Sequence, residues 1–338
     1  MSESPLTVVI PTLEAGPTLA ECVRSLERQT LADFDVIVVD NSREQRASRL
    51  EEVRRRARVI DNDRNLGFGA AVNQGIRASS SRWIATLNDD TVAHPRCLEA
   101  MLAAGEERYE IGMCAPQIRL FGEDRLDSAG MLLCRDGSSK QRGHLETPSR
   151  YPRRQQVLLP SGCAALYRRD MLEEIGLFDE RFFLYCEDTD LGLRARWKLW
   201  ECVYVPDAVV EHHYSRSAGQ ASALKAYYVE RNRLFVLIKN FPTRDLWVAP
   251  FFSLARYLWH AAYLIGGKGK AAEFASAGGG SALKLPWYVA RAQFAALRAL
   301  PYLLRERRRI QHGGRMQPRQ FDRMLSTYGI SPRRVAAL

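Results

Sequence analysis

The stretch "RWIATLNDDTVAHP", residues 82–95, decides how the first half of the chain folds. Its apolar run from Trp83 to Leu87 has the length of a buried strand, and Pro95 keeps the polar segment that follows from continuing as a helix. Asn and Asp side chains bond their own backbone, so residues 88–90 are typical of a turn at a strand end. A turn alone does not account for two adjacent carboxylates, because their repulsion costs free energy unless a cation or a donor lies between them.

The segments before this stretch alternate between strand and helix patterns. We expect strands at 7–10, 34–39, 58–60 and 82–87, and helices at 18–29, 47–56 and 69–78. Thr18 and Glu21 predict a capping box at the first helix. This alternation predicts an α/β fold of parallel strands linked by crossover helices, in which ligands bind beyond the carboxyl ends of the strands. The residues that follow strands, and are therefore expected at one sheet edge, are Pro11, Thr12, Asp40, Asn88, Asp89 and Asp90.

After residue 115 the pattern loosens, and it tightens again from residue 158. We expect helices at 168–175 and 187–197, then two short strands within 202–210. The second helix opens on Glu187, Asp188 and Asp190. Acidic residues in a first turn interact favourably with the helix dipole, so for Asp190 a structural role and a functional role both stay open.

Composition places the chain among globular proteins. Its 338 residues, 46% hydrophobic, suffice for one substantial core and a smaller appended part. The seven cysteines include no Cys-x-x-Cys pair, which favours a reduced compartment without a zinc site. The first apolar run, residues 6–10, is only of strand length, so we expect no secretory signal and a cytoplasmic protein.

The net charge of +10 is unevenly distributed. Residues 241–338 hold 16 Lys and Arg against 4 Asp and Glu, a net +12, whereas the first 240 residues hold 33 against 35. Because the positive charge is confined to one region, the net charge does not by itself indicate a nucleic-acid partner, and we expect none. The basic region is therefore considered separately.

Two segments of the basic region have the pattern of amphipathic helices. Residues 246–267 are apolar except for three polar residues on one helical face. A central Arg256 costs about 2.5–3.5 kcal/mol on insertion scales and Pro250 interrupts the helix, so lying in the membrane interface fits better than spanning it. The second segment carries a basic stripe beside Trp and Leu, as an interfacial helix on anionic lipid should, at Lys284, Arg291, Arg298 and Arg305. The alternative is two helices packed on the first domain with their arginines solvated.

Seven stretches resemble the inverting family-2 glycosyltransferases of the GT-A fold, and most closely the bacterial members that add rhamnose and similar sugars to surface glycans. They follow the family order between residues 6 and 240: "TVVIPT", "FDVIVVDNS", "NLGFGAAVNQGI", "LNDDT", "SGCAALYRRD", "FDERFFLYCEDTDLGLRAR" and "HHYS". The resemblance implies a GT-A catalytic domain at 1–240, with a Rossmann-like mixed sheet flanked by helices. Residues 241–338 would then be a basic amphipathic helical region that associates with membrane.

The resemblance also implies a divalent cation, Mn²⁺ or Mg²⁺. A sugar nucleotide leaves a diphosphate behind, and the charge that builds on it must be neutralised. Asp90 is the implied metal ligand, and Asp89 is expected near the ribose or the metal's water shell. His212 is expected as a second ligand, because imidazole suits Mn²⁺ better than Mg²⁺.

Donor binding is assigned through the same resemblance. Asp40 corresponds to the carboxylate that bonds the pyrimidine, although Asp40, Asn41 and Ser42 also have the pattern of a simple turn. Gly67 opens a predicted helix whose free N–H groups would admit nucleotide or phosphate. The full set of expected donor-binding residues is Pro11, Thr12, Asp40, Arg64, Asn65, Gly67, Asn73, Asn88 and Asp89. Leu13 and Glu14 replace the Tyr-Asn of many relatives, so the identity of the pyrimidine stays open.

Inversion requires a base that takes the acceptor's proton on the face opposite the leaving group. The resemblance points to Asp188 as this base, with Glu187 orienting the acceptor. The expected function is therefore metal-dependent transfer of a sugar, with rhamnose as the first candidate, from a dTDP- or UDP-linked donor to a lipid-linked or cell-surface glycan. The enzyme would work at the inner face of the cell membrane. The alternatives are a nucleotidyltransferase-like enzyme and an inactive membrane-bound scaffold that retains the fold.

Overall fold

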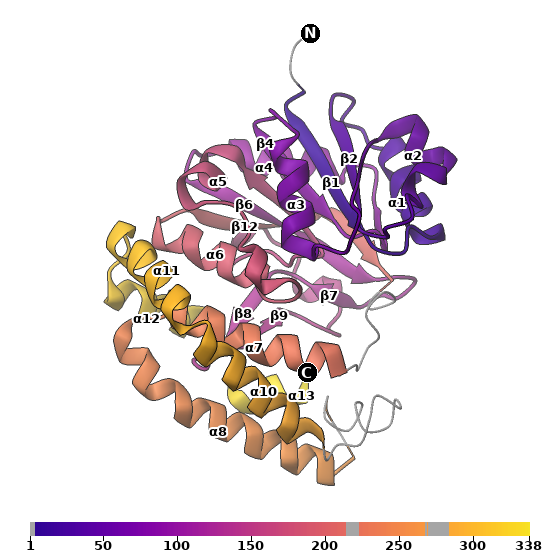
Figure 1. Ribbon diagram of the computed structural model, residues 1–338. Coiled ribbons are helices and arrows are strands. Elements are labelled where there is room, and N and C mark those ends of the chain that lie inside the picture. Colours follow the sequence, from indigo (N-terminus) through magenta and orange to yellow (C-terminus); the bar gives the residue numbers. More distant parts are fainter. Residues whose placement is uncertain (1–3, 214–222, 268, 270–283) are drawn as a thin grey trace. The chain divides into compact units, whose positions relative to one another are not determined.

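A computed structural model describes residues 4–213, 223–267, 269 and 284–338 (Figure 1). The chain divides into two compact units. Residues 1–130, 141–195 and 199–217 form the first, and residues 131–140, 196–198 and 218–338 form the second. Tyr214 and Ser215 of the "HHYS" stretch lie outside the described residues.

The first unit is built on a ten-stranded sheet with the order β10-β12-β6-β11-β4-β1-β2-β3, to which β5 adds beside β12 and β7 beside β6. The strands are β1 (Leu6–Thr12), β2 (Asp35–Asp40), β3 (Arg58–Asp61), β4 (Trp83–Leu87), β5 (Thr91–Ala93), β6 (Ile111–Leu120), β7 (Leu126–Ser128), β10 (Gln155–Val157), β11 (Ala164–Arg168) and β12 (Glu201–His212). The pairs β1–β2, β1–β4 and β2–β3 are parallel, which confirms the predicted alternation. Because β11 is antiparallel to both β4 and β6, the sheet is mixed, as expected.

Helices cover both faces of this sheet. They are α1 (Pro17–Glu27), α2 (Glu51–Arg56), α3 (Phe68–Arg77), α4 (Cys97–Glu106), α5 (Arg169–Ile175) and α6 (Glu187–Trp197). Val8 and Ile10 of β1 share one hydrophobic core with α1 and α4. The intervening Val9 meets Gly75 of α3, since successive strand residues point to opposite faces. Figure 1 shows α3 lying over the sheet.

Two local predictions were wrong. No capping box forms at Thr18 and Glu21, because α1 begins one residue earlier at Pro17, with Gly16 as its N-cap and no side-chain cap. The two short strands expected within 202–210 are one strand, β12, whose register against β6 shifts between Val205 and Val209. An irregularity of this kind lets a long strand bend without ending its pairing.

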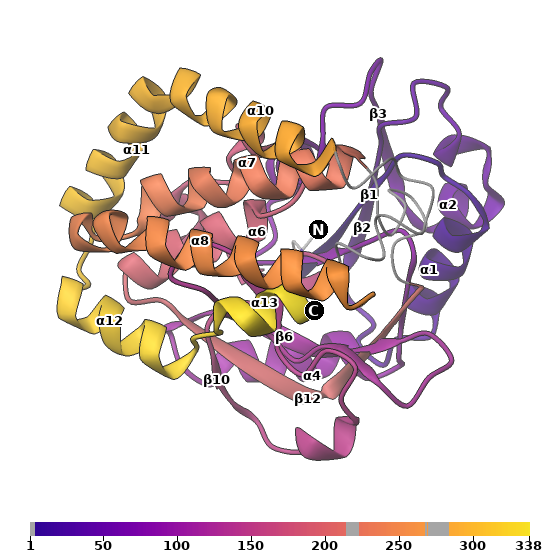
Figure 2. The same ribbon diagram turned by 90° about the horizontal axis from the view of Figure 1, so that it is seen from below.

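The second unit contains α7 (Ala223–Asn240), α8 (Thr243–Ile265), α10 (Leu285–Arg298), α11 (Leu300–Gly313), α12 (Pro318–Thr327) and α13 (Pro332–Ala337). The strands β8 (Met131–Leu133) and β9 (Ser139–Gln141) pair with each other. Figure 2 shows α7 beside α10 and α8 beside α13. The predicted basic helix is interrupted: α10 ends at Arg298 and α11 starts at Leu300, with Pro301 at its first turn.

Buried charges join the elements of the second unit. Arg256 of α8 bonds Asp136, at 2.7 Å, and Glu230 of α7, at 2.8 Å. Arg233 pairs with the same two carboxylates. Arg256 therefore points inward, where its charge is compensated. Among the described residues, no helix combines the length and apolar character needed to cross a bilayer.

Candidate active site

The sheet brings His212 beside Asp90. Strand β12 is parallel to β6 and so to β4, which puts their carboxyl ends at one edge. Strand β5 then pairs antiparallel with β12, with Thr91 opposite His212. The backbone N–H of His213 donates to the carbonyl oxygen of Asp90 at 3.0 Å. Residues 122 positions apart are thus fixed side by side by strand register.

The His212 imidazole lies between two carboxylates. Its Nε2 is 3.2 Å from Oδ1 of Asp90, and its Nδ1 is 2.9 Å from Oδ2 of Asp127. Burial opposes a charged imidazole, but Cys163, Asp127 and Asp90 outweigh it and raise the pKa of His212 well above its usual range. For Asp127, burial acts to raise the pKa, but the interactions with His144 and His212 outweigh burial and lower it to about 2.

Asp90 and His212 fit a divalent cation. Ligands at neighbouring positions of an octahedral ion with bonds of about 2.1 Å lie about 3 Å apart, close to the 3.2 Å between these two atoms. The ligand atoms of Asp127, Cys163 and His212 also lie within 4.8 Å of one another. Burial raises the pKa of the Cys163 thiol to about 11, and Cys binds a metal ion in its thiolate form.

Asp89 faces β1 instead. Thr12 donates from Oγ1 to Oδ2 of Asp89 at 2.5 Å, and the same hydroxyl oxygen accepts from the backbone N–H of Ala15. Burial raises the pKa of Asp89 to about 6, against the lowering effect of Thr12. Pro11 and Thr12 end β1 and Asn88 follows β4, so the predicted edge of the sheet is assembled as expected from strand order.

Asp188 is held by donors on both carboxylate oxygens. Gly162 donates its backbone N–H to Oδ2 at 2.8 Å, and Thr189 donates its backbone N–H to Oδ1 at 2.6 Å. A side chain at position 162 would place its Cβ 3.2 Å from the same oxygen. The next residue, Cys163, accepts the N–H of Asn88 at 2.9 Å. The short segment 161–163 therefore connects the carboxylate expected as base with the acidic turn after β4.

Glu187 is buried, with 6% of its surface exposed. Within the described part of the chain its Oε2 has no hydrogen-bond partner. Burial raises the pKa of Glu187 to about 8, and the neighbouring Asp188 adds to the shift. Burial also raises the pKa of Asp188, against the hydrogen bonds it accepts. Such perturbed carboxyl groups are typical of functional sites.

The loop before Glu187 has an unusual backbone. Phe183, Tyr185 and Cys186 have positive φ angles of 65°, 70° and 66°. Residues other than glycine adopt this region at a cost, and it is frequent where a site is held in a fixed geometry.

Two predicted donor-binding residues hold this loop. A Cβ on Gly67 would lie 2.4 Å from the carbonyl oxygen of Phe183, which accepts the N–H of Phe68 at 2.8 Å. The Asn73 amide donates to the carbonyl of Phe178 at 2.9 Å and accepts its N–H at 3.0 Å. The start of α3 is thus engaged by the chain itself, and donor contact by Gly67 and Asn73 stays a prediction.

Asp40 organises the turn that follows β2. Its Oδ1 accepts the N–H of Ser42 at 2.7 Å, and its Oδ2 accepts that of Ala47 at 2.8 Å. The turn interpretation of Asp40 therefore has structural support, and its contact with a pyrimidine stays a prediction. Asn65 accepts the N–H of Gly67 at 2.9 Å, while Arg64 is exposed.

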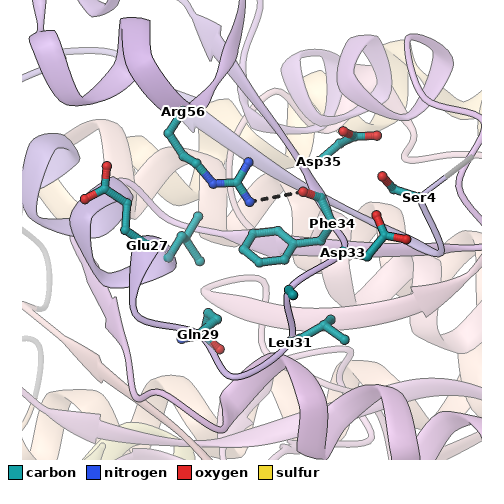
Figure 3. Close-up of a pocket in the computed structure, with 10 residues that line it drawn as sticks. Ser4, Glu27, Gln29, Leu31, Asp33, Phe34, Asp35 and Arg56 are labelled. Atoms are coloured by element: carbon teal, nitrogen blue, oxygen red, sulfur yellow. Dashed lines mark hydrogen bonds between the residues drawn. The ribbon is translucent and has the colours of Figure 1, made fainter. Parts of the chain in front are cut away.

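A pocket of about 500 Å³ lies at the other end of the sheet (Figure 3). It is lined by Ser4, before β1, and by Asp35, at the start of β2. Arg56 donates to the carbonyl oxygen of Phe34 at 3.0 Å across it. Because these are the amino ends of parallel strands, the pocket is separate from the candidate site and holds none of its residues.

This sheet, with acidic side chains and a histidine beyond the carboxyl ends of its strands, has the architecture of the GT-A glycosyltransferases. The profile of "Glycosyl transferase family 2" matches residues 7–176. The chain therefore belongs to glycosyl transferase family 2. This membership favours the glycosyltransferase expectation over the nucleotidyltransferase alternative.

Individual proteins give the same picture. The chain is 31% identical over 249 residues to N-acetylglucosaminyl-diphospho-decaprenol L-rhamnosyltransferase of Mycobacterium tuberculosis, covering 66% of this chain and 81% of that protein. It is 27% identical to an O-antigen biosynthesis protein of Myxococcus xanthus, over 66% of this chain but 18% of the relative. A crystal structure of GalNAc-T7 with UDP, GalNAc and Mn²⁺ shares the fold, with a TM-score of 0.60, 16% identity and coverage of 87% and 58%.

Sequence reasoning missed three residues that support the site: Gly162, Cys163 and Asp127. The first two belong to the stretch "SGCAALYRRD", whose resemblance to the family implies no role for either residue. Asp127 lies on a three-residue strand in the region where the sequence pattern loosens. A buried polar residue on so short a strand gives no periodic signal, so only the pairing of β7 with β6 reveals it.

Proposed function

We propose that the protein is a metal-dependent, inverting glycosyltransferase that moves a sugar from a nucleotide-diphosphate donor to a lipid-linked glycan. The observation that carries the proposal is the pair of atoms Asp90 Oδ1 and His212 Nε2, 3.2 Å apart beyond the carboxyl ends of β4 and β12. Family membership supports the reaction class. The mycobacterial relative, named for rhamnosyl transfer to a diphospho-decaprenol GlcNAc, supports dTDP-rhamnose as the first donor to test and such a lipid as the acceptor.

Asp90 and His212 would hold Mn²⁺ or Mg²⁺, which when bound supplies positive charge to the leaving diphosphate. Asp89 and Thr12 would bind the nucleoside part at the end of β1, beside Asp40. The hydrogen bond from Thr12 fixes the direction of the Asp89 carboxylate before any donor arrives. A fixed orientation lowers the entropy cost of binding.

Asp188 would take the proton of the attacking hydroxyl. Its hydrogen bonds from Gly162 and Thr189 hold the carboxylate in one orientation, which a base needs if it is to meet a single acceptor hydroxyl. Partial burial also raises the pKa of Asp188, which makes the carboxylate a stronger base. Direct displacement needs no covalent sugar intermediate, so one carboxylate suffices.

The direct test is a panel of nucleotide sugars measured by calorimetry, with Mn²⁺, with Mg²⁺ and with a chelator. We expect one dTDP- or UDP-linked donor to bind best, and its transfer to a GlcNAc-diphospho-prenyl acceptor to stop on chelation and resume with added cation. Full transfer by a verified metal-free Asp90→Ala protein would refute the role of the cation. An absence of transfer with every donor would favour the inactive scaffold.

We further propose that the second unit docks on anionic membrane. The outer face of α8 presents large apolar side chains that are more than half exposed: Trp247 (79%), Phe251 (73%), Leu254 (57%), Leu258 (62%) and Ile265 (89%). The only Lys or Arg between residues 246 and 265, Arg256, is buried in the ion cluster, so this face carries no cation of its own. A contiguous apolar face of this kind is typical of an interaction surface.

Helix α10 supplies the complementary charge. It exposes Trp287, Phe294 and Leu297 by 61–65%, and Arg291 and Arg298 are exposed on the same helix. Exposed apolar side chains combined with basic residues are typical of a helix that lies on an anionic lipid surface. The proposal retains the expected working place of the enzyme, beside a lipid-linked acceptor at the inner face of the membrane.

Sedimentation with vesicles of graded anionic content tests this docking on the full chain. Each basic residue near the surface contributes about 1 kcal/mol, so the double variant Arg291→Glu/Arg298→Glu should bind at least about 30-fold more weakly. Trp247→Ser/Phe251→Ser should weaken binding to neutral and anionic vesicles alike. The matched control is Tyr109→Ser, which removes a 61% exposed aromatic residue from the first unit. Equal sedimentation of wild type, both double variants and the control would refute the docking.

A further inference from the structure

Asp127 is a buried carboxylate that none of the expected catalytic roles uses. It lies on β7 with 1% of its surface exposed. One oxygen, Oδ2, is 2.9 Å from Nδ1 of His212. The other, Oδ1, is 3.4 Å from Nδ1 of His144, which also lies 3.1 Å from the Asp127 carbonyl oxygen. Burying a carboxylate is costly unless it is paired, so its position between two imidazoles calls for an explanation.

The contact with Nδ1 determines which nitrogen of His212 is available. An ionised carboxylate only accepts hydrogen bonds, so the nitrogen facing Asp127 must carry a proton. An imidazole that ligates a metal ion is neutral and has a single N–H, so its other nitrogen then has a lone pair for the ion. That other nitrogen, Nε2, is the one that faces Asp90. Carboxylates that bind the far nitrogen of a metal-ligating histidine orient the ring and raise its basicity.

The backbone reinforces this arrangement. Strands β7 and β12 both pair with β6, where Ser128 lies opposite Ile118 and His212 lies opposite Leu120. Asp127 and His212 are therefore fixed across one shared strand, 85 positions apart in sequence. Since neither residue is on a loop, the imidazole ring is held by rigid elements, as a precise site requires.

Two other roles would use the same atoms. Asp127 could serve only to anchor the short strand β7, in which case cation binding would not depend on it. It could instead be a metal ligand itself, together with Cys163 and His212, whose ligand atoms lie within 4.8 Å of one another. The three roles predict different responses to substitution at Asp127 and Cys163.

We propose that Asp127 is a positioning residue: by accepting the Nδ1–H of His212 it holds the imidazole so that Nε2 and Asp90 form a ready pair of cation ligands. The inference rests on the proposed function, because it deepens the same cation site.

The experiment measures Mn²⁺ binding to the full chain with UDP present, by electron paramagnetic resonance, and records the coupling of Mn²⁺ to ligand nitrogen. Wild type should show one directly bound nitrogen. Asp127→Ala should bind Mn²⁺ about 10–100-fold more weakly, the usual loss when such a partner is removed, and its nitrogen coupling should fade. Asp127→Asn should fall between the two, because its amide oxygen can still accept the Nδ1 proton without carrying charge.

Cys163→Ser separates the remaining roles. If Asp127 positions His212, replacing the thiol by a hydroxyl leaves Mn²⁺ affinity within about 3-fold of wild type. A loss as large as that of Asp127→Ala would place the cation among Asp127, Cys163 and His212 and overturn the proposal. Wild-type affinity and nitrogen coupling in a folded Asp127→Ala would overturn it as well, in favour of a strand anchor.

Folding is checked by the thermal midpoint and by UDP binding in chelator. If Asp127→Ala does not fold, Asp127→Asn decides, and unchanged Mn²⁺ affinity in that variant overturns the proposal. Failure of the proposed function is a separate result. It would appear as wild-type protein that binds Mn²⁺ through nitrogen but transfers no sugar.

Discussion

Replacing Glu187 by Gln should make the first unit more stable at neutral and alkaline pH. The side chain is buried, its Oε2 has no partner among the described residues, and its pKa is raised from 4.5 to about 8. Gln has the same shape and never ionises. The variant therefore removes the cost of keeping this carboxyl protonated at neutral pH, or charged at alkaline pH, and changes little else.

The magnitude follows from linkage between protonation and folding. Below about pH 4.5 the carboxyl is protonated in both folded and unfolded chains, and its ionisation does not affect stability. Between pH 4.5 and about 8 the unfolded chain releases a proton that the folded chain keeps, so wild-type stability falls by up to about 1.4 kcal/mol per pH unit. The full shift, from 4.5 to about 8, corresponds to about 5 kcal/mol.

Urea unfolding at pH 5, 7 and 8.5 measures the effect. The difference in unfolding free energy between Glu187→Gln and wild type should be small at pH 5 and should grow at each higher pH. Glu173→Gln, on an exposed position of α5, is the matched control and should follow wild type throughout. Parallel pH profiles for wild type and Glu187→Gln would show that the folded protein does not hold Glu187 as a neutral acid, and the reasoning would be refuted.

Three further substitutions test other parts of the account. Asp188→Asn should lower kcat by about 10²–10⁴-fold, the usual contribution of a general base, with donor affinity by calorimetry unchanged; normal turnover would exclude Asp188 as the base. Gly67→Ala places a Cβ 2.4 Å from the carbonyl oxygen of Phe183, at a φ of +88°. The variant should lose at least about 1–2 kcal/mol of unfolding free energy and should transfer sugar more slowly. Wild-type stability together with wild-type transfer would contradict the tight packing of Phe183 against Gly67. Arg256→Met leaves two buried carboxylates short of a partner and should lower the free energy of urea unfolding by about 3–5 kcal/mol. The control Arg309→Met, at an exposed position, should lower it little. A similar small loss in both variants would show that the buried ion cluster does not stabilise the second unit.

The parallel half of the fold could be predicted because each strand ends in a recognisable turn. Leu87 closes an apolar run before an Asn-Asp-Asp turn, and Asp40 closes another, so strand ends and their shared edge follow from local pattern. The His212–Asp90 pair could not be derived in this way, since it depends on the pairing of β5 with β12. Strand pairing across 122 positions leaves no local signal, and here family resemblance supplied what periodicity could not.

The direction of side chains was the least predictable feature. Arg256 read from sequence as a polar interruption of an apolar helix, and it is the buried partner of Asp136. Gly67 is expected to admit phosphate, which stays a prediction, and the packing of Phe183 against Gly67 was not foreseen. Both outcomes depend on which distant segment packs against the residue. Sequence spacing shows which residues share one face of a helix, but it does not show which segment packs against that face.

The most direct test of the central claim is the configuration of the product. Wild-type protein, the best donor of the panel, Mn²⁺ and the prenyl-linked acceptor are incubated, and the one-bond carbon–hydrogen coupling at the new anomeric carbon is measured by NMR. We predict a product whose anomeric configuration is opposite to that of the donor, as a single displacement assisted by Asp188 requires. A product that retains the donor's configuration, or no product with any donor of the panel, would contradict the account.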